Sequence, residues 1–276
     1  MALKMVDIHT HGIGRYDTRT ANAAHILKMA ALHGRAGVSA IVPTVYPGSI
    51  SKMRTDLTAI AEAMEAGDKK GGARILGAHL EGPFLNPLKC GALNAKSFQA
   101  PTSRALGDLL GGYEKVVRII TIAPELKGAS KVIEKAASMG IVVSMGHSNA
   151  TYEEARKGKK AGASSVTHLF NAMRPMHHRE PGLAGFALMD EDICVELICD
   201  GLHVSPEMLR VVFKLKSSKR IIAVSDSVTG SMKKDGVLQG GGSALSPARK
   251  TLEEIGLSSG SIEMILGGNA RRLLRQ

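Results

Sequence analysis

Short runs of β-branched and apolar residues alternate along the chain with longer stretches in which apolar residues recur at helical spacing. This alternation is typical of βα units arranged around a parallel sheet. The runs predict eight strands, at residues 4–9, 38–44, 74–80, 116–122, 141–145, 165–168, 193–199 and 220–225. The stretches between them predict helices that include residues 21–35, 49–66, 129–139, 151–161 and 206–215.

Eight strands, each followed by a helical stretch, favour a TIM (β/α)8 barrel over an open doubly wound sheet, which usually has about five or six strands. We therefore expect an α/β fold in which residues 1–276 form a single barrel domain. A glycine-rich stretch at 236–242 lacks the spacing of a dinucleotide-binding motif and predicts a flexible loop. A helical tail follows over residues 246–276, with a break near Gly267 and Gly268.

Two predicted helices carry their own start signals. Thr151 stands three residues before Glu154, which is the spacing of a capping box. Ser205 precedes Pro206, so that a capping hydroxyl is followed by a proline in the first helical position. Both boundaries are therefore predicted from local chemistry as well as from periodicity.

The composition indicates a protein of the cytoplasm. With 276 residues and 44% hydrophobic content, the chain can bury a large core. It has no apolar run of about eighteen residues and no secretory signal pattern at its start, which argues against a membrane location. The three cysteines Cys90, Cys194 and Cys199 match neither a disulfide framework nor a zinc knuckle, so we expect them to be reduced.

The formal charge of +11 favours an anionic partner, because positive potential attracts phosphates and carboxylates. Nucleic acid is not expected: aromatic residues make up only 3% of the chain, tryptophan is absent, and the basic residues are scattered. An anionic small substrate and a merely solvated basic surface remain the two interpretations.

Residue types that bind metals fall at the ends of the predicted strands, which form the active-site face of a barrel. His9 and His11 end the first strand, and a strand period of two points both to the same side. Glu81 ends the third strand, where a buried carboxylate needs a cation, hydrogen bonds or solvent. The ordinary alternatives are a histidine pair on a surface loop and a structural salt bridge.

His147 follows the fifth predicted strand and His168 ends the sixth. A lone histidine on an apolar strand is more often a core residue, but these two with Glu81 form an N₂O set with room for water, as in a catalytic zinc site. Asp226 ends the eighth strand, where it can act as general base beside a metal or simply cap a turn. The convergence favours a metal-dependent hydrolase.

With these motifs the chain resembles the amidohydrolase superfamily and, within it, the N-acetylglucosamine-6-phosphate deacetylases. The motifs stand in family order: H-x-H at 9–11, HLEGPF at 79–84, GHS at 146–148, THLFNAM at 167–173, HHREPG at 177–182, DGLHV at 200–204 and SD at 225–226. The resemblance implies hydrolysis of the N-acetyl group of N-acetylglucosamine 6-phosphate by a metal-bound water, giving glucosamine 6-phosphate and acetate.

The resemblance also implies roles for single residues. Glu81, His147 and His168 would hold the principal divalent metal, with zinc favoured over iron or manganese, and His9 and His11 a second ion in binuclear members. Asp226 would be the general acid and base. Substrate contacts would come from Asn171, the backbone of Ala172, His203 and Arg179, the last reaching the phosphate across the interface of a homodimer.

The chain departs from the family pattern in two ways. We expect residues 1–276 to span the barrel alone, whereas members usually carry a small β-domain as well. Leu93 stands where members usually have a substrate-positioning histidine, a role that Asn94 would have to take over. Leu93 therefore favours an alternative substrate, another N-acetyl sugar or N-acyl amine, and a remote alternative is a non-catalytic barrel that binds an anion or a sugar.

Overall fold

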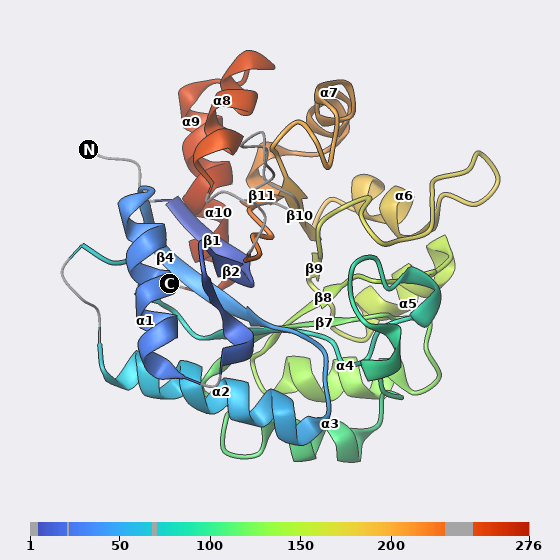
Figure 1. Ribbon diagram of the computed structural model, residues 1–276. Coiled ribbons are helices and arrows are strands. Elements are labelled where there is room, and N and C mark those ends of the chain that lie inside the picture. Colours follow the sequence, from blue (N-terminus) through green and yellow to red (C-terminus); the bar gives the residue numbers. More distant parts are fainter. Residues whose placement is uncertain (1–4, 21, 68–70, 230–244, 276) are drawn as a thin grey trace.

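The computed structural model describes residues 5–20, 22–67, 71–229 and 245–275. Eight parallel strands lie side by side in the order of the chain, with helices around the outside (Figure 1). The strands are β1 (Met5–Thr10), β4 (Val38–Val45), β6 (Ala78–Glu81), β7 (Val117–Ile122), β8 (Val142–Met145), β9 (Ser165–Val166), β10 (Cys194–Ile198) and β11 (Ile221–Val224). The short β5 (Arg74–Ile75) pairs with β4, and β2 (Gly12–Ile13) pairs with β3 (Tyr16–Asp17) as a small antiparallel ribbon.

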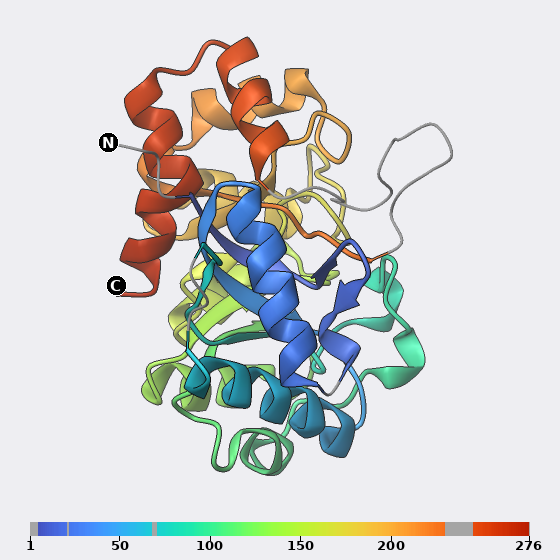
Figure 2. The ribbon, with the colours of Figure 1, turned by 60° about the vertical axis from the view of Figure 1, so that its left-hand side comes forward.

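The helices that follow the strands cover the outside of the sheet. They are α1 (Ala23–Arg35), α2 (Ile50–Glu65), α3 (Ser103–Leu110), α4 (Ala129–Ser138), α5 (Tyr152–Lys160), α6 (Gly182–Met189), α7 (Pro206–Leu215), α8 (Ser246–Glu254), α9 (Ser259–Glu263) and α10 (Asn269–Leu273). In Figure 2, α1 lies in front of the sheet with the C-terminal helices above it and to one side. No helix in the described ranges combines the length and the apolar character that crossing a membrane requires.

The last strand meets the first and closes the barrel. The backbone N–H of Asp226 donates to the carbonyl of His9 at 2.9 Å, and that of His11 donates to the carbonyl of Ser227 at 2.8 Å. Thr10 and Ser227 form a parallel bridge at the same level. This closure confirms the predicted TIM (β/α)8 barrel and brings the two halves of the chain together at the C-terminal ends of the strands.

Two apolar clusters form the core. The larger one packs strand residues against the surrounding helices. The smaller one joins Val6 and Ile8 of β1 to Val224 of β11 and to Ala270 and Leu274 near the C-terminus. Buried polar side chains gather instead at the C-terminal ends of the strands, among them Thr10, Thr44, His79, Glu81, Thr121, His147, Thr167, His168, Ser225 and Ser227. The apolar core and most of the buried polar side chains thus occupy different parts of the barrel.

The predicted strands and helices agree with the structure to within about two residues at most of their ends. The predicted strand 74–80 is divided into β5 and β6 at Gly77, whose φ is 136°. A Cβ atom at this position would lie 2.5 Å from the carbonyl oxygen of Val116, so only glycine fits here without a shift. Helices α3 and α6 were not predicted. Helix α6 is buried on all sides from Gly182 to Leu188, so it has no amphipathic periodicity.

Both predicted helix starts are confirmed. Thr151 and Glu154 form a reciprocal capping box, and the Ser205 side chain accepts from the N–H of Met208. The glycine-rich stretch at 236–242 lies outside the described residues. The predicted break at Gly267 and Gly268 is wrong: residues 264–268 form a wider π turn that continues the helix, and the interruption falls instead at Gly256, whose φ is 89°.

One buried histidine beneath the barrel mouth links fold stability to pH. His33 of α1 has no exposed surface, its Nε2 lies 3.0 Å from the Thr10 hydroxyl, and that hydroxyl lies 2.7 Å from the Ser227 hydroxyl. Burial lowers the pKa of His33 from 6.5 to about 4. Because the unfolded chain binds this proton more readily, protonation favours unfolding between those two pH values.

We predict that the free energy of unfolding falls by about 2 kcal/mol through His33 alone as the pH drops from 7 to 5. The variant His33→Gln, which keeps a polar group but does not titrate, should lose that part of the pH dependence. Urea unfolding of chelator-treated wild type and variant at pH 5, 6 and 7 measures it. Identical pH slopes in the two proteins would contradict the assignment.

Candidate active site

Glu81, the last residue of β6, lies at the centre of a group of four histidines. It is only 2% exposed. Its Oε1 lies 3.1 Å from Nε2 of both His147 and His168 and 3.3 Å from Nε2 of His9. Its Oε2 lies 3.1 Å from Nε2 of His11. The predicted meeting of these strand ends at one place is therefore seen in the structure.

Asp226 completes the group on its solvent side. Its side chain is 26% exposed, and its Oδ1 lies 3.4 Å from Nε2 of His9 and 3.6 Å from Nε2 of His11. Two adjacent sets of donor atoms result, one from Glu81, His147 and His168 and the other from His9, His11 and Asp226. Glu81 touches both sets, because its two oxygens face different histidines.

The buried charges depend on one another. Burial alone would raise the pKa of Glu81, but the neighbouring His147 and His9 hold that pKa well below its usual range. Burial alone would lower the pKa of His9, but Asp226, Glu81 and Glu196 raise it well above its usual range. The Glu81 carboxylate likewise raises the pKa of His168 against the effect of burial. The low pKa of the buried Glu81 carboxyl therefore depends on the histidines beside it.

These donor atoms fit a divalent cation. His147 donates from Nδ1 to the carbonyl of Lys89 at 2.9 Å, so the Nε2 that faces Glu81 carries a lone pair when the ring is neutral. Ligand atoms in a tetrahedral zinc site with bonds of about 2.0–2.1 Å lie roughly 3.3 Å apart. The separations of 3.1 Å among Glu81 Oε1, His147 Nε2 and His168 Nε2 are close to that value.

Three of these residues have backbone conformations that residues other than glycine rarely adopt. The φ angles of His147, His168 and Asp226 are 46°, 29° and 46°. Phe170 and Ala172, just after His168, have φ angles of 76° and 49°. Such strain persists only where the surrounding structure enforces it, and it gathers at functional sites.

Neighbouring hydrogen bonds hold the strained backbone in place. The carbonyl of His147 accepts from the N–H of Asn86 at 3.0 Å. Glu125 accepts from the Ser148 hydroxyl at 2.7 Å and from the N–H of Asn149 at 2.6 Å, which fixes the loop after His147. The N–H of Leu169, next to His168, donates to the carbonyl of Glu196 at 2.8 Å.

A pocket of about 530 Å³ opens above these donor atoms. Its wall includes Asn171, Ala172 and His203, which were predicted to contact substrate, and also Leu93. His203 lies 2.7 Å from Asp200 through its Nδ1, and this hydrogen bond raises the pKa of His203. The pocket therefore combines the candidate metal ligands with polar groups at its rim.

Two residues predicted to contact substrate lie outside this pocket. Asn94 is exposed, and its side chain accepts from the N–H of Lys96 at 3.1 Å, so it caps a turn. Arg179 is exposed in the loop before α6 and does not line the pocket of its own chain.

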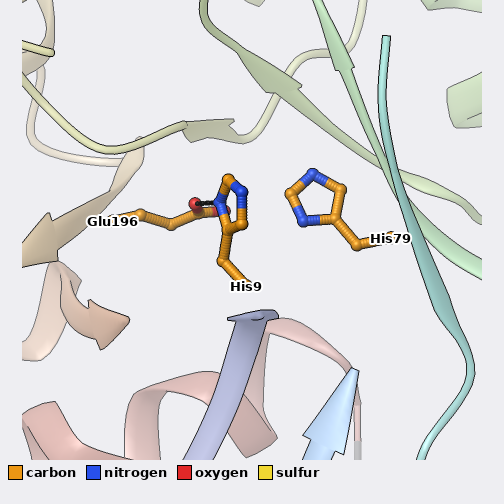
Figure 3. A group of neighbouring side chains, drawn as sticks. All are labelled: His9, His79 and Glu196. Atoms are coloured by element: carbon orange, nitrogen blue, oxygen red, sulfur yellow. Dashed lines mark hydrogen bonds and ion pairs between the residues drawn. The ribbon is translucent and has the colours of Figure 1, made fainter. Parts of the chain in front are cut away.

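Sequence reasoning missed several residues around the site. The Tyr46 ring stacks on the ring of His11 at a centroid distance of 3.9 Å. The guanidinium carbon of Arg19 lies 4.4 Å from the centroid of the same Tyr46 ring. Glu196 lies beside His9, with His79 on the opposite side of the His9 ring (Figure 3). Glu196 could have been noticed, because it is the one charged residue in the apolar run 193–199.

Comparison with known proteins agrees with this geometry. No protein-family model matches the chain. The N-acetylglucosamine-6-phosphate deacetylase of Bacillus subtilis (strain 168) is 35% identical over 94% of this chain and 66% of its own length. The N-acetylgalactosamine-6-phosphate deacetylase of Escherichia coli O157:H7 is 31% identical over 96% of this chain and 67% of its own length. The chain thus spans about two thirds of these curated relatives.

Solved structures give the same result. The N-acetylglucosamine-6-phosphate deacetylase of Thermotoga maritima superposes with a TM-score of 0.88 at 30% identity, covering 99% of this chain and 78% of its own. The corresponding enzyme of Mycobacterium smegmatis superposes with a TM-score of 0.90 at 28% identity over 99% of this chain and 78% of its own. A mutant of that enzyme is known in complex with N-acetyl-D-glucosamine-6-phosphate. By these identities and coverages, the chain belongs to the N-acetylglucosamine-6-phosphate deacetylase family.

Proposed function

We propose that the protein is a metal-dependent amide hydrolase that converts N-acetylglucosamine 6-phosphate and water into glucosamine 6-phosphate and acetate. The observation that carries the proposal is the convergence of Glu81, His147 and His168 at the base of the pocket, with Asp226 beside them. The family membership and the substrate complex of the mycobacterial relative support this choice of substrate.

In this proposal Glu81, His147 and His168 hold a principal divalent cation, and His9 and His11 with Asp226 hold a second. Imidazole and carboxylate donors suit zinc, which we favour, and also iron and manganese. A bound cation supplies Lewis-acid chemistry, in that it lowers the pKa of a water molecule and polarises the amide carbonyl. The low exposure of Glu81 limits competition from bulk solvent at this point.

Asp226 is proposed as the general acid and base. Its carboxylate is the most exposed of the group and faces the pocket, so a water molecule can reach it. It takes one proton from the attacking water and delivers it to the amine nitrogen as the carbon–nitrogen bond breaks. Asn171, the backbone of Ala172 and His203 line the pocket and are proposed to orient the sugar.

Arg179 is proposed to bind the substrate phosphate in the site of a partner subunit. Its exposure and its position outside its own pocket agree with a role across a homodimer interface. The guanidinium group suits bidentate binding of a phosphate, and the net charge of +11 favours an anionic substrate. We also propose that residues 1–276 act as one domain in the cytoplasm, where unpaired Cys90, Cys194 and Cys199 stay reduced.

A second candidate is deacetylation of a different N-acetyl sugar. Leu93 places an apolar side chain in the pocket wall, where the family resemblance implies a histidine. The relative that acts, by its name, on N-acetylgalactosamine 6-phosphate is 31% identical. Loss of one hydrogen-bond donor to the reacting carbonyl costs about 10²- to 10³-fold in rate, which would alter selectivity between related substrates.

Metal binding is expected to stabilise the fold. Adding zinc to chelator-treated protein at about one hundred times its dissociation constant should stabilise the folded state by about 2.7 kcal/mol. Glu81→Gln should lose most of this gain, whereas the exposed Glu153→Gln should keep it, as followed by thermal unfolding. An unchanged gain in Glu81→Gln would contradict the proposed ligand set.

Replacement of the general base should slow the reaction while the cation at Glu81, His147 and His168 stays bound. We expect Asp226→Asn to lower kcat for acetate release by about 10²- to 10⁴-fold, with Asp192→Asn as an exposed control. Assays with N-acetylglucosamine 6-phosphate, N-acetylgalactosamine 6-phosphate and unphosphorylated N-acetylglucosamine identify the substrate. If unphosphorylated substrate turned over best, the phosphate proposal would be wrong; if none turned over, the hydrolase proposal would be.

The contribution of Arg179 to a partner site can be tested by complementation. Arg179→Ala and Asp226→Asn should each be poorly active. When they are co-expressed, about half of the randomly formed dimers pair the two variants, and each such dimer has one intact site. About a quarter of all sites should therefore regain wild-type function. Specific activity of the purified mixture measures this. Activity no higher than the mean of the two single variants would place Arg179 in its own subunit or outside the reaction.

A further inference from the structure

Glu196, in the middle of β10, is a carboxylate with no exposed surface. Its Oε2 lies 3.0 Å from Nδ1 of His9, which is the one side-chain hydrogen bond that Glu196 makes within the described part of the chain (Figure 3). Among the described residues its Oε1 has no hydrogen-bond partner. A buried acid in an apolar strand costs stability unless a specific partner compensates for it, so its contact with His9 needs an explanation.

The contact determines which nitrogen of His9 carries a proton. An ionised carboxylate can only accept hydrogen bonds, so Nδ1 donates to Glu196. Nε2 then faces the remaining acceptors, Glu81 Oε1 at 3.3 Å and Asp226 Oδ1 at 3.4 Å. A lone pair directed at two carboxylates is favourable only when a cation lies among them. The tautomer that Glu196 imposes is therefore the one that binds a metal through Nε2.

His79, the third member of this group, does not compete as a ligand. Its Nε2 lies 2.8 Å from the Thr121 hydroxyl, and its Nδ1 lies 3.3 Å from the carbonyl of Ile8. Since a carbonyl accepts, Nδ1 donates and has no lone pair to offer. The group of His9, His79 and Glu196 is thus a support beneath the metal position and not a separate metal site.

The backbone of Glu196 supports the other set of donors. Its carbonyl accepts from the N–H of Leu169 at 2.8 Å, directly after His168, whose φ is 29°. One residue therefore orients a histidine of one donor set through its side chain and restrains a histidine of the other through its backbone. Only the side-chain contact can be removed by substitution, which makes the two effects separable.

We propose that Glu196 is a positioning residue that fixes His9 with Nε2 directed at a second cation held with His11 and Asp226. This inference rests on the proposed function, because it concerns the metals of the same site. Removal of an outer partner of a metal-binding histidine typically weakens metal affinity by about 10- to 100-fold. In Glu196→Ala the affinity for the second cation should fall by that factor, and the cation at Glu81, His147 and His168 should be retained.

The experiment counts bound zinc per chain across buffered zinc concentrations in wild type, Glu196→Ala and Glu196→Gln. We expect two ions in the wild type and selective weakening of one in Glu196→Ala. Glu196→Gln should fall between them, because its amide oxygen still accepts from Nδ1. Glu153→Gln, which changes an exposed carboxylate of α5 that pairs with Arg156, is the control and should match the wild type.

Nitrogen-15 spectra of the histidine rings in the zinc-loaded wild type add a test that needs no variant. The proposal expects His9 to carry its proton on Nδ1, and a proton on Nε2 would overturn it even if Glu196→Ala failed to fold. Equal affinities in wild type and both Glu196 variants, or a single ion in the wild type, would also overturn it while leaving the proposed hydrolase intact. A wild type that binds no metal would instead remove the proposed function itself.

Discussion

The buried carboxylate of Glu81, surrounded by the Nε2 atoms of four histidines, is the interaction on which the site depends. An ion so deeply buried is costly, and it is held by partners that come from the start and from the middle of the chain. His9 and His11 lie at the first strand and His168 at the sixth, so the group exists only when the barrel is closed. Fold and chemistry are therefore coupled through one residue.

Closure of the barrel is achieved by backbone hydrogen bonds that also place the reactive groups. The bond from the N–H of Asp226 to the carbonyl of His9 joins the last strand to the first and brings the Asp226 side chain to the histidines. Strained loop conformations at His147, His168 and Asp226 turn these side chains inward. Glu125 and Glu196 add fixed contacts behind them, so that the site is organised before substrate arrives.

Much of this could be predicted from the sequence, because parallel strands repeat a simple apolar pattern and their C-terminal ends share one face. Glu81, His147, His168 and Asp226 could be placed at these ends from the sequence for that reason. Helix α6 escaped prediction because it is apolar on every side, and the turn that the Asn94 side chain caps was not foreseen because the cap is a local contact. Glu196 was missed because its proposed role depends on a contact with His9, 187 positions away, that only the closed barrel creates.

A crystal structure of zinc-loaded protein, with anomalous diffraction measured on both sides of the zinc absorption edge, is the most direct test of the site. We predict an anomalous peak bonded to Glu81, His147 and His168, with Asp226 adjacent. A peak held by other residues, or none at that position in protein saturated with zinc, would contradict it.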